Sequence, residues 1–279
     1  MYFTYLPFSF LGVAIKFANE KDDENYYKMV EMLIDQDNRN SSMNVHKRFT
    51  PMHYAAYLGN LRIVKTLIKL CDPKDLFKVD FDYHETSPFF YILDCYILPS
   101  ANEPQLRFEL ARIMAEHAHP KAIIGEIVKD ELYHSPLTMA IQNNDIQFIE
   151  GVAPYVASVM YPDLTNSDIS SYMHYAIEER RFDALKILLK YSENKNPADQ
   201  EGNTLVHQAA WENLPEFVEY LITIVDDWNS LNNEGLTPLA IAEEEHFTEI
   251  VGILESAIKT RKREISFSDC SIKSKKMKK

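Results

Sequence analysis

The sequence predicts an all-α protein built as a solenoid of stacked helix pairs, and three observations lead to this fold class. A six-residue pattern recurs six times along the 279 residues, with Thr or Ser first and an apolar anchor third. The anchors fall at residues 52, 89, 137, 173, 206 and 239, so successive anchors are 37, 48, 36, 33 and 33 residues apart. A period near 33 residues is typical of stacked repeats. Apolar residues then follow each anchor at helical spacing, and the 7 glycines in the chain leave room for long helical runs.

Each copy of the pattern predicts the start of a first helix. The copies read TPMHYA at 50–55, SPFFYI at 87–92, SPLTMA at 135–140, SYMHYA at 171–176, TLVHQA at 204–209 and TPLAIA at 237–242. Thr and Ser are good N-cap residues, and Pro in second place suits the first helical position, where its missing N–H costs nothing. The pattern therefore marks six helix starts.

The residues before each helix predict a turn. Five positions ahead of five of the Thr or Ser residues stands a turn-forming side chain: Asp82, Asp130, Asn166, Asp199 or Asn232. Asp and Asn side chains accept hydrogen bonds from nearby backbone amides and so start turns. Gly202 and Gly235 follow three residues after Asp199 and Asn232, where we expect a positive φ.

These motifs resemble those of the ankyrin repeat family, whose signature is T-P-L-H-x-A on a 33-residue period. The last two units, 199–210 and 232–242, match best, and the resemblance covers roughly residues 44–258. It implies a solenoid of helix-turn-helix units joined by finger turns. It also implies that His53, His174 and His207 make structural hydrogen bonds between helix and finger rather than catalytic ones.

The resemblance further implies which residues the second helix of each unit buries. They stand 11, 12, 15 and 16 positions after the anchor and share one helical face. Counted from the anchors, they are Ile63, Val64, Leu67 and Ile68; Phe148, Ile149, Val152 and Ala153; Ala184, Leu185, Leu188 and Leu189; Phe217, Val218, Leu221 and Ile222; and Ile250, Val251, Leu254 and Glu255. Glu255 alone is charged, as expected of a last repeat that faces solvent.

Three segments are expected. Residues 1–43 are interpreted as a degenerate N-terminal capping repeat, with Leu11, Ala14 and Ile15 opening its first helix and Met29 and Val30 its second. Residues 44–258 form the repeat array, with a Pro-rich insertion near 97–106 between two helices. Residues 259–279 are expected to be a basic, disordered tail. The apolar stretch near the N-terminus is too short to span a bilayer and lacks the basic start of a secretory signal.

Charge is divided unevenly along the chain. Against 29 Lys and Arg stand 42 Asp and Glu, a net charge of −13, yet residues 259–279 hold nine Lys or Arg and only two acids. The acidic body disfavours nucleic acid and favours a partner protein with a basic surface, whereas the tail could bind anions, nucleic acid included. Basic clusters are also candidates for nuclear import; here the candidates are Arg261, Lys262, Arg263, Lys275, Lys276, Lys278 and Lys279.

The resemblance implies that a partner contacts the finger tips and the exposed side of the first helices. The residues expected there are acidic or aromatic, apart from one leucine: Tyr57, Tyr83, Leu132, Glu178, Glu179, Glu201, Trp211, Glu212, Glu234, Glu244 and Glu245. Tyr and Trp are frequent anchors of protein interfaces. The carboxylates of Glu178, Glu179, Glu212, Glu244 and Glu245 occupy equivalent places in three successive repeats, so stacking should gather them into a stripe.

Nothing in the chain predicts an enzyme. It lacks a G-x-S-x-G motif, a phosphate-binding glycine loop and an H-E-x-x-H motif, and its three cysteines have no metal-ligand spacing. We therefore expect no catalytic residue, cofactor or metal, and a reducing compartment. The predicted function is a cytoplasmic, monomeric protein-interaction module that binds a basic segment, with nuclear import as an alternative location. Two alternative roles are an inhibitor of a transcription factor, similar to the inhibitor-of-NF-κB proteins, and an adaptor that recruits substrates to a signalling or ubiquitin-ligase complex.

Overall fold

The computed structural model describes residues 10–37, 50–72, 87–93, 104–118, 123, 135–157 and 169–276, with backbone alone for 35–37 and 264–276. The chain divides into two compact units, residues 1–169 and 170–279. The described residues are mainly helical and include no strand, only an isolated antiparallel bridge between Ala198 and Thr204. The all-α solenoid predicted from the repeat period is therefore confirmed.

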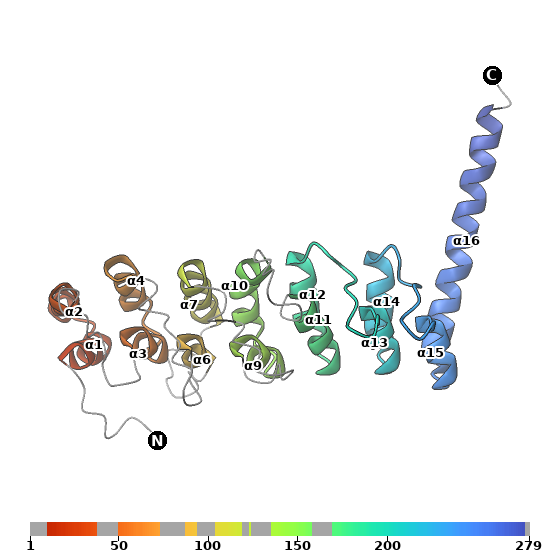
Figure 1. The fold of residues 1–279 in the computed structure, drawn as a ribbon. Helices are drawn as coiled ribbons and strands as arrows, with labels where there is room; N and C mark the ends of the chain where they lie inside the picture. The colour runs from red at the N-terminus through yellow and green to blue at the C-terminus, as the bar shows by residue number, and fades with distance from the viewer. Residues whose placement is uncertain are drawn as a thin grey trace. The chain divides into compact units, whose positions relative to one another are not determined.

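In the first unit the helices alternate between two layers (Figure 1). The first layer holds α1 (Phe10–Lys21), α3 (Pro51–Leu58), α6 (Pro88–Leu93) and α9 (Pro136–Gln142). The second holds α2 (Glu24–Asp37), α4 (Leu61–Leu70), α7 (Pro104–His117) and α10 (Ile146–Ala157). Successive helices within a layer pack side by side, which is how each repeat buries the apolar face of the one before it.

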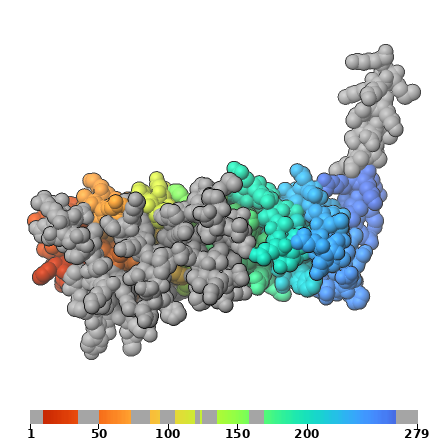
Figure 2. Space-filling view, viewed as in Figure 1, coloured from red at the N-terminus to blue at the C-terminus, as the bar shows by residue number. Residues whose placement is uncertain are grey.

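The second unit repeats this arrangement. Its first layer is α11 (Ile169–Glu178, which begins at the unit boundary), α13 (Leu205–Trp211) and α15 (Pro238–Glu244). Its second layer is α12 (Phe182–Tyr191), α14 (Pro215–Ile224) and α16 (Thr248–Lys276). In the space-filling view, the described part of this unit forms a continuous surface without gaps between its helices (Figure 2).

The predicted core positions are buried almost throughout. Five of the six anchors, Met52, Phe89, Leu137, Met173 and Val206, are fully buried, and the second helices bury their predicted faces as well. The last repeat differs, because Leu239 and Val251 are only half-buried and Glu255 is exposed. These side chains are less buried than their counterparts in the preceding repeats, as expected where a repeat has no neighbour packed against that face.

Four predicted caps start helices, at Thr50, Ser135, Thr204 and Thr237, whereas α11 begins at Ile169, two residues before the predicted cap Ser171. The Thr50 hydroxyl lies 2.8 Å from Nδ1 of His53, and the Thr204 hydroxyl lies 2.9 Å from Nδ1 of His207, which closes a capping box in both repeats. At Ser135 the box is closed by Thr138 instead of His. The other ring nitrogen of His207 is 3.1 Å from the carbonyl of Leu236 in the following finger. The backbone amides of Thr50 and Thr204 also donate to these Nδ1 atoms at 3.1 Å, so the capping boxes satisfy amides at the helix starts.

The finger turns also follow the sequence prediction where the structure describes them. The carboxylate of Asp199 accepts a hydrogen bond of 2.7 Å from the amide of Asn203, and the side chain of Asn232 accepts one of 2.9 Å from the amide of Leu236. Gly202 and Gly235 have φ values of 77° and 78°. Other side chains reach such angles only with strain, so Gly is favoured at both places. Asp82, Asp130 and Asn166 lie outside the described residues.

The two finger glycines should respond differently to alanine. A Cβ at Gly202 would lie 2.6 Å from the side-chain oxygen of Asn233 and 3.0 Å from its backbone nitrogen, whereas a Cβ at Gly235 meets nothing within 4 Å. We expect Gly235→Ala to lower the free energy of unfolding by about 1 kcal/mol, from backbone strain alone. Gly202→Ala should cost at least about 1 kcal/mol more, because the crowding adds to the strain. Urea denaturation of both variants tests this. Equal losses of unfolding free energy would show that the finger shifts enough to relieve the contact between a Cβ at residue 202 and Asn233.

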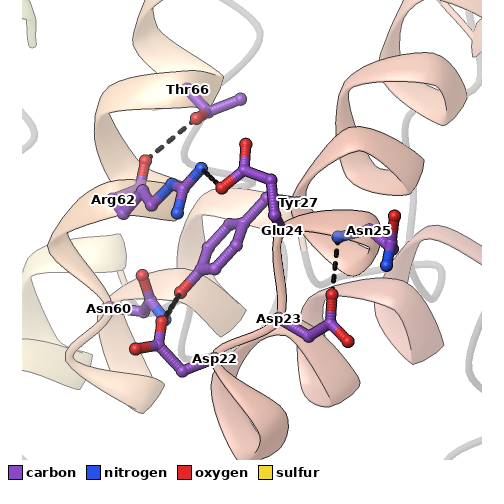
Figure 3. A network of polar contacts seen from close by, with 8 residues as sticks. All are labelled: Asp22, Asp23, Glu24, Asn25, Tyr27, Asn60, Arg62 and Thr66. Carbon is purple, nitrogen blue, oxygen red and sulfur yellow. Dashed lines mark hydrogen bonds and ion pairs between the residues drawn. The ribbon is translucent and has the colours of Figure 1, made fainter.

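A polar network joins the N-terminal helix pair to the next repeat (Figure 3). The Tyr27 hydroxyl donates to Asp22 at 3.1 Å, and the amide nitrogen of Asn60 donates to the Tyr27 oxygen at 3.2 Å. The Arg62 guanidinium lies 3.8 Å from the centre of the Tyr27 ring and pairs with Glu24. Residues 10–37 therefore form a helix pair docked on α3 and α4, although Phe10, Phe17, Met29 and Met32 stay exposed on it.

The structure describes part of the predicted insertion and most of the predicted C-terminal tail. Of the insertion expected near 97–106, residues 97–103 lie outside the described chain, and Pro104 already begins α7. The segment expected to be disordered is helical instead, since α16 continues through it to Lys276. From Ile253 to Lys276 the sequence contains no Pro or Gly to end a helix. None of the described helices has an apolar stretch long enough to span a membrane.

Candidate functional site

The second unit carries an open groove of about 410 Å³ on the side of its first-layer helices and fingers. One helix after another contributes to it, from α11 through α13 to α15, together with the two finger turns that precede α13 and α15. Its lining residues are mostly polar or acidic: Glu178, Glu201, Asn203, His207, Gln208, Trp211, Glu212, Asn232, Glu234, Leu236 and Ile241. The groove thus brings together positions that repeat every 33 or 34 residues in the sequence.

Negative charge dominates this groove. Glu178, Glu201, Glu212 and Glu234 line it, and none of the described residues in the lining is a Lys or Arg. Burial raises the pKa of Glu178, and the neighbouring carboxylates of Glu179 and Glu212 raise it further. Keeping Glu178 ionised therefore costs free energy in the unbound protein, and a bound cationic group would remove that cost.

Trp211 supplies the main apolar surface of the groove. It is the last residue of α13 and remains 60% exposed, although indole is among the largest apolar side chains. Glu212 caps the same helix, so an acidic and an aromatic side chain stand next to each other. An indole face with carboxylates around it suits a cationic side chain, which can pair with the carboxylates and lie over the ring.

Hydrogen bonds between successive fingers hold the groove in shape. Asn232 donates to the side chain of Asn203 at 2.8 Å, and Asn233 donates to the carbonyl of Gln200 at 3.0 Å. Burial lowers the pKa of His207 more than its hydrogen bond to Leu236 raises it. This imidazole therefore stays neutral near pH 7 and does not offset the four carboxylates.

The structure gathers five of the sequence-predicted partner-binding residues in the groove: Glu178, Glu201, Trp211, Glu212 and Glu234. Glu179, Glu244 and Glu245 belong to the same unit but do not line the groove, and Glu244 and Glu245 are exposed at the end of α15. Tyr57 lies in the first unit, half-buried, with its ring 6.5 Å from that of Tyr91. Tyr83 and Leu132 lie outside the described residues.

Sequence reasoning did not predict that the amide side chains of Asn203 and Asn232 share a groove with Gln208. Asn203 and Asn232 occupy the fingers, and Gln208 lies on α13 between the buried His207 and Ala209. Asn203 and Asn232 are 29 residues apart and occupy different places in two successive fingers. Polar amides at turn positions have a local explanation, however, and only the stacking of fingers showed that they line a shared surface.

The basic cluster on α16 is accessible at its first half. Arg261, Lys262 and Arg263 are all exposed. For Lys275 and Lys276 the structure gives a helical backbone, and Lys278 and Lys279 lie outside the described residues. Within the described residues, no three His, Cys, Asp or Glu side chains group together in a way that could hold a metal ion.

The cost of burying the Glu178 carboxylate beside Glu179 and Glu212 should be measurable in the free energy of unfolding. Because the folded-state pKa of Glu178 is raised, its ionised form is disfavoured on folding, and the penalty is present at neutral pH but absent below the ordinary pKa of 4.5. We expect Glu178→Gln to increase the free energy of unfolding at pH 7, by less than about 1 kcal/mol because the side chain is exposed and screened by solvent. Urea denaturation at pH 7 and pH 4 should show a gain only at pH 7, smaller in high salt. Glu219→Gln, on the outer helix α14, serves as control.

The chain is similar to two curated viral proteins over part of its length. It is 29% identical over 123 residues to an ankyrin repeat protein of fowlpox virus (strain NVSL), which is 43% of this chain and 16% of that protein. It is 28% identical over 82 residues to an ankyrin repeat protein of Acanthamoeba polyphaga mimivirus, which is 29% of this chain and 11% of that protein. The chain therefore spans only a small part of the length of these relatives.

The chain is also similar to two solved structures. The ankyrin repeat domain of Bcl-3, described as a unique member of the IkappaB protein family, matches with a TM-score of 0.60 and 17% identity, covering 90% of this chain and all of that one. The ankyrin repeat protein EF0377 matches with a TM-score of 0.49 and 20% identity, covering 73% of this chain and 96% of that one. At these identities the likeness to Bcl-3 supports the fold alone.

Family models agree with the repeat register. The model for three copies of the ankyrin repeat matches residues 137–227 and 173–263, and the single-repeat model matches residues 47–77. Together these matches cover more than half of the 279 residues. The six signatures, the paired helices, the finger turns and the model matches lead to one conclusion: the chain belongs to the ankyrin repeat family.

Proposed function

We propose that this protein is a non-catalytic interaction module whose acidic groove binds a basic segment of a partner protein. The groove is the one in the second unit, lined by Glu178, Glu201, Glu212 and Glu234 around the exposed indole of Trp211. Ankyrin repeats are interaction modules, and their stacked units present extended binding surfaces.

The observation that carries the proposal is the unbalanced charge of the groove. Four carboxylates line the groove with no Lys or Arg in the described lining, and burial, together with the charges of Glu179 and Glu212, raises the pKa of Glu178. Like charges brought together lower the stability of the free protein, so their convergence makes sense if a basic ligand neutralises them. A large exposed aromatic side chain in the lining of the groove is typical of an interface anchor.

The proposal is tested by comparative affinity capture from cell extract. The full chain is used as bait beside a variant in which Glu178, Glu179 and Glu212 are all changed to Lys, each in low and moderate salt. We expect basic proteins to be retained by the wild type, lost with the variant and reduced in moderate salt. Identical sets of proteins on both baits would refute the role of the groove.

The partner captured in this way distinguishes the specific roles. An inhibitor of a transcription factor, similar to the inhibitor-of-NF-κB proteins, would retain a DNA-binding protein through its basic surface. An adaptor would retain a substrate together with a ligase or signalling enzyme. Both roles would use the same groove, and the protein would act in the cytoplasm or, if imported, in the nucleus.

We further propose that the basic cluster on α16 is a nuclear-import signal, because Arg261, Lys262 and Arg263 are consecutive and exposed. A fluorescent reporter fused to residues 259–279 should accumulate in nuclei. Changing Arg261, Lys262, Arg263, Lys275 and Lys276 to Ala should abolish this accumulation. A reporter that stays evenly distributed would contradict the proposal and leave the cluster as a solvated helix face.

A further inference from the structure

A groove of about 830 Å³ lies in the first unit, on the outer side of the second-layer helices α2 and α4. It is separate from the acidic groove. Its apolar surface comes from Met32 on α2 and from Leu61 and Leu70 at the two ends of α4. Met32 is 64% exposed, which is unusual for so apolar a side chain.

One wall of this groove is basic. Lys65 and Lys69 stand one helical turn apart on the outer face of α4, and both are exposed. Among the described residues neither forms an ion pair. Arg62 also lines the groove, but its guanidinium is held against Tyr27 and Glu24, as Figure 3 shows, so its charge is already balanced. Glu31, on α2, is the carboxylate of the opposite wall.

An equivalent lysine pair elsewhere in the chain shows what is unusual here. Lys65 and Lys69 stand 13 and 17 positions after the anchor Met52, and Lys186 and Lys190 stand 13 and 17 positions after the anchor Met173. On α12, however, Lys186 pairs with Asp183 at 3.4 Å and lies 4.0 Å from the centre of the Phe182 ring. Lys190 lies 5.0 Å from the centre of the Tyr191 ring. The lysines of α12 are engaged by their own helix, whereas those of α4 face an open groove.

From these observations we infer that the outer groove between α2 and α4 is a second docking surface, and that its ligand is an acidic amphipathic helix of a partner protein. The groove runs along the ten residues of α4, or about 15 Å, which accommodates two to three turns of helix. A helix laid there would place apolar residues at i, i+3 and i+7 against Met32, Leu61 and Leu70. Its Glu or Asp residues would meet Lys65 and Lys69.

This site uses the opposite charge and the opposite helix layer from the acidic groove, so the two surfaces can bind different ligands. An acidic helix is repelled by the acidic groove, and a basic segment is repelled by the lysines of α4. The inference therefore does not depend on the proposed function of the acidic groove.

The test uses the full chain and two labelled synthetic peptides. Both carry Leu at i, i+3 and i+7 over about three turns; one has Glu at the flanking positions and the other has Lys. In fluorescence anisotropy at low salt, the Glu peptide should bind at least about tenfold more tightly than the Lys peptide. Changing Lys65 and Lys69 to Glu should weaken its binding at least about tenfold, and Met32→Gln should weaken it as well, while circular dichroism confirms that both variants are folded.

The matched control is the variant with Lys186 and Lys190 changed to Glu, which has the same net charge and the same repeat positions. Because these two lysines do not line the groove, this variant should bind the Glu peptide within about twofold of the wild type. A nonspecific effect of net charge would instead weaken binding equally in both double variants. Equal loss in both double variants, equal binding of the two peptides, or binding of neither would overturn the inference. Retention on phosphatidylserine vesicles that depends on Lys65 and Lys69, without preference between the peptides, would overturn it in favour of a membrane surface.

Discussion

Leu188→Asp is expected to unfold the second unit. Leu188 is fully buried on α12, on the face that also buries Leu185 and Leu189. An aspartate there would place a carboxylate among apolar side chains without a partner, and the variant would lose both the apolar contacts and the hydration of the charge. We expect a loss of more than about 4 kcal/mol, which is comparable to the whole stability of a small domain.

The consequence should spread beyond one helix, because each repeat is stabilised mainly by contact with its neighbours. Far-ultraviolet circular dichroism should show a large loss of helix, and hydrogen exchange should show lost protection across α11 to α14. Lys190→Asp, an exposed change on the same helix, should leave the protein folded. A stable Leu188→Asp protein with native helix content would refute the repeat register on which the core assignment rests.

The core could be predicted because it depends only on the repeat period and on which side chains are apolar. Met52, Leu137, Met173 and Val206 mark the register, and the helix pairs built on them bury the residues expected from the count, apart from the half-buried Ile68 and Ile222. The finger glycines were predictable for a similar reason, since a positive φ is a local requirement. The groove was predicted in part: equal repeat positions brought Glu178 and Glu212 together, as expected from stacking.

The remaining differences arise from contacts between repeats that no local pattern encodes. Tyr57 is half-buried because the ring of Tyr91 in the next repeat lies against it. The network of Tyr27, Asn60 and Arg62 depends on how the N-terminal helix pair docks. The helical continuation of α16 could have been predicted from the absence of Pro and Gly, but the charge of the segment favoured disorder instead. Lys65 and Lys69 could be assigned to a docking surface only once the structure placed them in one groove with the exposed Met32.

Charge reversal in the acidic groove should act mainly on the rate at which a basic partner associates. Complementary charges steer encounter and raise association rates well above those of neutral surfaces, and salt weakens this effect. Changing Glu178, Glu179 and Glu212 to Lys alters the local charge by six, so association at low salt should slow by at least about tenfold. The binding kinetics of a captured basic partner, measured on the immobilised full chain at two salt concentrations, give this rate directly.

Trp211→Ala should act mainly on the rate at which the partner dissociates. The indole contributes apolar area and a cation-binding face, which hold the complex together after encounter and contribute little to steering. We expect dissociation to become roughly 30-fold faster, equivalent to ~2 kcal/mol, with association nearly unchanged. Because Trp211 is 60% exposed, its removal should leave the fold intact, which thermal unfolding can verify.

The control for the triple reversal changes Glu193, Glu219 and Asp226 to Lys. These carboxylates are exposed in the same unit but do not line the groove, so the variant has the same net charge as the triple reversal. If steering depends on the groove, the control should associate nearly as fast as the wild type at moderate salt. Equal slowing in both variants would mean that net charge alone attracts the partner. An association rate insensitive to salt and to both variants would place the interface on another surface and leave the four groove carboxylates as solvated side chains.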